Sequence, residues 1–162
     1  FEQGAKHVNP RAAVAVTMIG NTPAAWTDPA RGAELTKAQV AQGIDVVFAA
    51  AGTSGLGILQ AAKDAGILAI GVDSNQNGLH PGSVLTSVLK RVDLAVLQAF
   101  KGVEPGITAL GLKEGGVDLA MDEHNAKLVT AAMRARLDAA RADIVAGRLK
   151  VIDYTTASRC AP

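Results

Sequence analysis

The sequence predicts an α/β fold, a parallel sheet flanked by helices in an αβα sandwich. Hydrophobic residues make up 49% of the 162 residues but aromatic residues only 3%, so the core must be built from Ala, Val, Leu and Ile. Such a core is typical of sheets that helices cover. Short apolar runs rich in β-branched residues alternate with stretches of helical length, and glycines follow several of these stretches. This order predicts βαβ units with right-handed crossovers in a single domain spanning residues 1–162.

The first half of the chain is expected to hold three buried strands. The Asn9-Pro10 pair ends an initial helix because the residue before proline avoids the α region. The Asp28-Pro29 pair starts another helix, since aspartate caps free amides and proline fits the first turn. Strands are expected at residues 12–19, 44–50 and 67–72, and helices at about 1–8, 28–42 and 55–65.

The second half has a less regular pattern. The Gly115-Gly116 pair interrupts it, and Gly147 closes a long final helix. That helix carries Leu128, Met133, Leu137 and Ile144 roughly on one side. Strands are expected at 84–88, 107–112, 117–121 and, as a strand-like end, 149–154, and helices at about 91–101 and 126–146.

Charge and composition exclude several classes of function. The 16 basic and 15 acidic residues are spread along the chain and give no basic patch for nucleic acid or an anionic membrane surface. No apolar run approaches the roughly 18 residues of a membrane helix, so we expect a soluble chain. The single cysteine, Cys160, can form no internal disulfide. The three histidines, His7, His80 and His124, are isolated from one another and from Cys160, which argues against a metal site; no cofactor is expected.

Special residues follow three expected strands at their carboxyl ends, where open parallel sheets bind ligands. Trp26, the only tryptophan, lies in a loop of small and polar residues and can stack on a flat ring. The turn GTSGLG (residues 52–57) offers amide donors at a helix N-terminus. Asp73 can accept hydrogen bonds from both hydroxyls of a vicinal diol. These residues together favour noncovalent binding of a polar small molecule such as a sugar derivative.

Two catalytic alternatives remain open from the residues alone. A dinucleotide site is suggested by the order strand, glycine turn, helix and acidic residue, although GTSGLG reads G-x-x-G-x-G instead of G-x-G-x-x-G. A hydrolase is suggested by Ser54, Asp73 and either His80 or His124, although the nucleophile elbow requires glycine where Leu56 stands. Each feature also has a simple structural explanation: packing for the glycines, a turn cap for Asp73 and a loop anchor for Trp26.

Four segments carry a resemblance to a known family: WTDPARGAELTKAQVAQGIDVVFAAAGTSGLGILQAAKDAG, AIGVDSNQ, LTSVLKRVD and LGLKEGGVDLA. Together they cover most of the chain, and it resembles the basic membrane protein family of ABC-transporter substrate-binding proteins, which includes bacterial purine nucleoside receptors. The resemblance implies one lobe of a type I periplasmic-binding fold, in which two lobes close over a ligand without chemistry. It also implies a periplasmic protein or cell-surface lipoprotein that hands a nucleoside-like ligand to an ABC transporter permease.

The resemblance assigns roles to particular residues. Trp26 would stack on the base, while Asp73, Lys90 and the glycine turn would line the ribose side; the turn residues are Gly52, Thr53, Ser54 and Gly55. The role of Lys90 rests on the resemblance alone. Only the second half of the family is matched, and residues 89–112 are expected to belong to the first lobe. We therefore expect either a fragment or a chain that pairs with a second copy, as a homodimer or domain-swapped assembly. A Rossmann-like nicotinamide-dependent enzyme and a protein-interaction module are the alternative functions.

Overall fold

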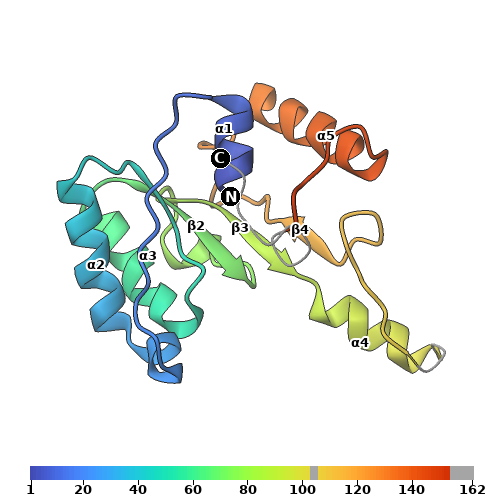
Figure 1. Cartoon of the computed structure of the whole chain (residues 1–162), viewed down its shortest axis with the longest axis horizontal. Coiled ribbons are helices and arrows are strands. Elements are labelled where there is room, and N and C mark those ends of the chain that lie inside the picture. Colours follow the sequence, from blue (N-terminus) through green and yellow to red (C-terminus); the bar gives the residue numbers. More distant parts are fainter. Residues whose placement is uncertain (103–105, 154–162) are drawn as a thin grey trace. The chain divides into compact units, whose positions relative to one another are not determined.

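The computed structural model describes residues 1–102 and 106–153, which form two compact units (Figure 1). Unit 1 combines Phe1–Val14 with Ala131–Pro162, described as far as residue 153, and unit 2 is Ala15–Thr130. Every residue of the predicted ligand site lies in unit 2.

Unit 2 is built on a four-stranded sheet of order β1-β2-β3-β4. The strands are β1 (Val46–Phe48), β2 (Leu68–Asp73), β3 (Val84–Lys90) and β4 (Val117–Leu119). The first three are parallel, so their carboxyl ends lie at one edge of the sheet, while β4 runs antiparallel to β3. The predicted α/β class is confirmed, and four of the predicted strands overlap these observed ones, although β2 and β3 extend one and two residues beyond the predicted ends.

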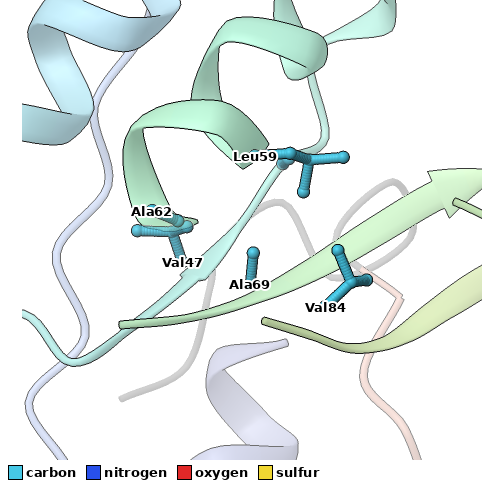
Figure 2. Packing of buried hydrophobic residues seen from close by; sticks show 6 residues of the cluster. Val47, Leu59, Ala62, Ala69 and Val84 are labelled. Carbon is cyan, nitrogen blue, oxygen red and sulfur yellow. The ribbon is translucent and has the colours of Figure 1, made fainter. Parts of the chain in front are cut away.

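The core of unit 2 lies between the sheet and helix α3 (Gly55–Asp64). Leu59 and Ala62 of α3 face Val47, Ala69 and Val84, one residue from each parallel strand, and all five are buried (Figure 2). Small residues on the strands allow the helix to approach closely, which explains how so few aromatic residues can fill this core.

Helix α2 (Pro29–Ala41) packs on α3, and its start is as predicted. The Arg31 backbone amide donates to Oδ1 of Asp28 at 2.9 Å, while Pro29 occupies the first turn. At this crossing a side chain on Gly57 would overlap the carbonyl oxygen of Pro29. Glycine is therefore required for the two helices to pack as they do.

Short 3₁₀ turns and one further helix complete unit 2. The turns are η1 (Pro23–Thr27), η2 (Gly52–Ser54) and η3 (Asn77–Leu79), and the helix is α4 (Val92–Phe100). Helix α4 has no buried residue, and Phe100 is 87% exposed although it is a large apolar side chain.

Unit 1 contains α1 (Glu2–Val8) and α5 (Ala131–Val145). The side chain of Gln3 in α1 hydrogen-bonds both backbone groups of Ile152: its amide nitrogen donates to the Ile152 carbonyl at 3.3 Å, and its oxygen accepts from the Ile152 amide at 3.0 Å. These bonds join the N-terminal helix of unit 1 to its C-terminal segment.

Three predicted strands are wrong. Residues 12–19, 107–112 and 149–153 pair with no other strand in the described chain. An apolar, β-branched run forms a strand only where a partner supplies ladder hydrogen bonds, and these runs have none. Val16 and Met18 are 79% and 76% exposed, and Ile107 is fully exposed. The last predicted residue of the third run, Tyr154, lies outside the described residues, as does Cys160.

The final helix starts later than predicted, at Ala131 instead of residue 126. The residues between Asn125 and the start of α5 form a turn, in which the Asn125 carbonyl accepts from the amides of both Leu128 and Val129. The buried side chain of Asn125 also donates to the carbonyls of Leu85 and Ala120, each at 2.9 Å. These bonds fix the segment after β4 against β3.

Candidate ligand-binding site

The Trp26 loop is tied by hydrogen bonds to the glycine turn after β1. The hydroxyl of Thr53 donates to the Trp26 carbonyl at 2.8 Å, and the hydroxyl of Ser54 donates to the Ala25 carbonyl at 2.6 Å. Ser54 Oγ also accepts from the Asp28 amide at 2.7 Å. The loop is thus held at the carboxyl end of β1, and not at the end of the strand expected at residues 12–19, which does not form.

Trp26 is 58% exposed, and the edge of its ring lies over Gly52. A Cβ on Gly52 would lie 3.3 Å from Cε3 of the ring and 3.0 Å from the Trp26 carbonyl oxygen. Gly52 also has φ of +56°, a conformation that favours glycine. The turn therefore needs glycine both for its own backbone and to accommodate the tryptophan.

Asp73 and Lys90 meet at the ends of β2 and β3. Nζ of Lys90 lies 3.1 Å from Oδ1 of Asp73, and both side chains are exposed. Asp73 is the only described residue other than glycine with positive φ, at +67°. Such backbone strain is often found at ligand-binding positions, and aspartate tolerates it better than most residues.

A pocket of about 430 Å³ opens beside Trp26. Its lining is mainly apolar and includes Met18, Pro23, Trp26, Phe48, Ala50 and Ile58. Neither Asp73 nor Lys90 lines it. The carboxyl edge therefore presents two different surfaces, an apolar pocket with an exposed indole beside β1 and an ion pair at the ends of β2 and β3.

The predicted turn residues differ in how they are presented. Thr53 is exposed and Gly52 half-buried, whereas Ser54 and Gly55 are buried. The Gly55 amide donates within the turn, to the carbonyls of Gly52 and Thr53. Ser54 and Gly55 are therefore placed to support the site and not to touch a ligand in this conformation.

Sequence reasoning did not single out Phe48, which joins Trp26 in the pocket lining. A signal was available, because the chain holds three phenylalanines, one tryptophan and one tyrosine, and Phe48 lies near the end of a predicted strand. In a chain with so few aromatic residues, one close to a carboxyl strand end is a candidate binding residue.

The geometry does not match the hydrolase alternative. The Ser54 proton is donated to a backbone carbonyl, and Ser54 Oγ is buried between the Trp26 loop and α2. A nucleophilic serine instead donates to its general base. Among the described residues, no group of three or more His, Cys, Asp or Glu is arranged to hold a metal ion.

A polar cluster formed by Asn75, Asn77, Asp122 and His124 contains a carboxylate with a lowered pKa. Oδ2 of Asp122 accepts from the side-chain amides of Asn75 at 2.7 Å and Asn77 at 3.1 Å, and Oδ1 accepts from the His124 backbone amide. Hydrogen bonding, first from Asn75, stabilises the charged carboxylate and lowers the pKa of Asp122. The cluster links η3 to the segment after β4.

Comparison with known proteins identifies the family. The family model described as "ABC transporter substrate-binding protein PnrA-like" matches residues 1–153. The chain belongs to this family. Basic membrane protein D of Borreliella burgdorferi strain JD1 is 35% identical over 133 residues, which cover 76% of this chain and 38% of that protein. The resemblance inferred from the sequence is thereby confirmed.

Solved structures show the same fold. An ABC transporter solute-binding protein from Aeropyrum pernix K1 superposes with a TM-score of 0.76 at 24% identity, over 93% of this chain and 50% of that one. Another, from Conexibacter woesei DSM 14684, gives 0.71 at 20% identity, over 94% and 51%. This member of the PnrA-like family thus has the fold of one lobe of a solute-binding protein and spans about half the length of those structures.

No helix in the described parts of this PnrA-like chain combines the length and the apolar character needed to cross a bilayer.

Proposed function

We propose that this chain is the ligand-binding lobe of a substrate-binding protein for an ABC importer, and that its ligand is nucleoside-like and is bound without chemical change. One observation carries the proposal: an exposed Trp26 and the Asp73–Lys90 ion pair lie at the same carboxyl edge of the sheet. A nucleoside combines a flat base with a ribose diol, which matches these two kinds of surface.

The base stacks on the exposed face of Trp26, with the apolar pocket beside it. The ribose hydroxyls donate to the Asp73 carboxylate, while Lys90 donates to a sugar oxygen. Because both charged side chains are exposed, their mutual attraction is screened by water and contributes little to stability. A ligand can therefore insert between them at small cost.

The second wall of the site is supplied by another α/β lobe. This chain spans about half of the solved relatives, so the described residues form only one side of a two-lobed clamp. Closure of the two lobes captures the ligand in the periplasm or at the cell surface, and the closed protein delivers it to the permease. Alone, the chain binds weakly because half of the contacts are missing.

The proposed two-lobed arrangement also explains the apolar surface around α4. Val92, Val96, Leu97 and Phe100 are between 49% and 87% exposed, and Ile107 is fully exposed. Monomeric proteins rarely expose large apolar patches. In this proposal the other lobe covers it, in line with the expectation that residues 89–112 belong there.

Light scattering of the purified chain, together with an apolar dye, tests this coverage. A monomer that binds the dye supports a surface that awaits the other lobe. A dimer that does not bind the dye indicates that a second copy covers this surface in place of the other lobe, as a homodimer or a domain-swapped assembly. A monomer without dye binding contradicts both versions.

Thermal unfolding against nucleosides, free bases, pentoses and NADH tests the ligand, since a compound that binds only the folded state raises Tm. A shift with nucleosides in the wild type that is lost in Asp73→Asn supports the proposed site. A shift with NADH alone favours the nicotinamide alternative. No shift with any compound, even at millimolar concentration, contradicts small-molecule binding by this lobe and favours a protein-interaction module.

A further inference from the structure

We infer that Ser54 is a positioning residue whose buried hydroxyl fixes the Trp26 loop at the binding edge. The link from this role to ligand affinity rests on the proposed function, whereas the positioning itself does not. Sequence resemblance placed Ser54 among residues that line the sugar, and the geometry points to a different role.

The hydroxyl of Ser54 connects two backbone groups that flank Trp26. It donates to the Ala25 carbonyl at 2.6 Å and accepts from the Asp28 amide at 2.7 Å. The hydroxyl thus donates one hydrogen bond and accepts one, and the residue is 0% exposed. The adjacent hydroxyl of Thr53 donates to the carbonyl of Trp26 itself at 2.8 Å.

The loop depends on these bonds because little else holds it. Trp26 is 58% exposed, and none of the η1 residues is buried. Burial of apolar surface therefore contributes little to fixing the indole, and the orientation of the ring is set by the backbone beneath it. Without the Ser54 hydroxyl, the Ala25 carbonyl and the Asp28 amide each lose a partner.

Asp28 extends the connection to helix α2. Its amide donates to Ser54, while its carboxylate caps the helix by accepting from the Arg31 amide at 2.9 Å. Ser54 immediately precedes α3, so it holds the Trp26 loop relative to both α3 and α2. A ring held in this way is ordered before the ligand arrives, which reduces the entropy lost on binding.

The test uses the fact that Trp26 is the only tryptophan, so the intrinsic fluorescence excited at the tryptophan band reports on this loop alone. Ser54→Ala is compared with Ser87→Ala, which removes a matched hydroxyl. Ser87 is also 0% exposed, donates to Oδ1 of Asn77 at 2.9 Å and accepts from the Gln76 amide at 2.9 Å. Both variants lose a buried hydroxyl with one donated and one accepted bond.

We expect both variants to lower Tm, but only Ser54→Ala to lower the fluorescence anisotropy and increase acrylamide quenching of Trp26 below the unfolding transition. Nucleoside affinity should fall about tenfold in Ser54→Ala, the equivalent of one lost positioning hydrogen bond. Thr53→Val, at an exposed site that tolerates the change, should alter the same two fluorescence readouts in the same direction. It keeps the inference testable if Ser54→Ala does not fold.

Three outcomes are decisive. The positioning role is overturned if anisotropy and quenching stay at wild-type values in Ser54→Ala. If Ser54→Ala fails to fold, wild-type values in Thr53→Val overturn it instead. Equal changes in Ser54→Ala and Ser87→Ala also overturn it, because they reflect general loosening of the fold. A wild type that binds no nucleoside, combined with a fluorescence change confined to Ser54→Ala and Thr53→Val, supports positioning and rejects the proposed ligand.

Discussion

Oδ1 of Asp73 and Nζ of Lys90 lie 3.1 Å apart at the ends of two neighbouring parallel strands. No local sequence pattern pairs these residues. The pair exists because β2 and β3 are in register, with Asp73 opposite Leu89, so that consecutive strand ends project their charges at the same edge.

Asp73→Asn should abolish most nucleoside binding while leaving Tm nearly unchanged. The substitution keeps a side chain that tolerates the positive φ of +67° but removes the charge that accepts from two hydroxyls. The lost ion pair is exposed and contributes about 0 to 1 kcal/mol to stability. Calorimetric titration and thermal unfolding measure the two effects, and unchanged affinity would remove Asp73 from the site.

Trp26→Ala should weaken nucleoside binding by about 1 to 3 kcal/mol, the range found for bases stacked on aromatic side chains. Its effect on the free energy of unfolding should be small because Trp26 is 58% exposed. Phe100→Ala is a suitable control, since Phe100 is 87% exposed and does not line the pocket beside Trp26. Equal affinities for the wild type and Trp26→Ala would rule out stacking.

Gly57→Ala should destabilise unit 2 by about 1 to 3 kcal/mol, because the added methyl group overlaps the Pro29 carbonyl and forces α2 away from α3. Gly4→Ala is the matched control. Gly4 lies within α1 with no atom near its missing Cβ, so alanine should stabilise the helix by up to about 1 kcal/mol. Urea unfolding compares the two, and a neutral Gly57→Ala would show that the helix crossing adapts easily.

Stability should fall as the pH is lowered from about 7 to 5, in part because of His80. Burial lowers the pKa of His80, nearby Lys63 lowers it further, and Asp64 opposes the shift. Between its ordinary pKa of about 6.5 and the lower folded value, the unfolded chain binds a proton that the folded chain does not. Its Nδ1 is buried with no hydrogen-bond partner among the described residues, so a proton there would be unsatisfied.

His80→Gln should make the pH dependence of Tm shallower over this interval. His124→Gln provides the comparison, because the His124 side chain is accessible beside Glu123. If both substitutions change the slope equally, His80 has no special part in it.

Local chemistry explains which features were predictable. The cap formed by Asp28 and the helix ends at glycines depend on a few neighbouring residues, and they are found where predicted. The strands that contain Val47 and Ala69 pair with each other and were also located correctly. By contrast, residues 12–19 have an equally strong strand pattern but no paired neighbour in the sheet, and a sequence pattern cannot supply that partner.

The candidate site likewise has some features that the sequence predicts and others that it does not. The loop of Trp26, the turn at Gly52 and the position of Asp73 at the end of a strand follow from order along the chain. The inward direction of the Ser54 hydroxyl does not, because it depends on contacts between residues 25–28 and 52–54 that only the folded backbone creates. A serine in a glycine turn therefore predicts a ligand contact as readily as a structural bond.

The division of unit 1 between the two halves of the chain affects the order of folding. Phe1–Val14 has its partners in the segment after residue 130, as the Gln3–Ile152 bonds show, whereas unit 2 is a continuous stretch between them. During synthesis unit 2 can fold as soon as its last strand emerges, but α1 must wait for the final helix. A chain truncated after residue 130 should already protect the core around Leu59 from proteolysis, with its first helix still unprotected.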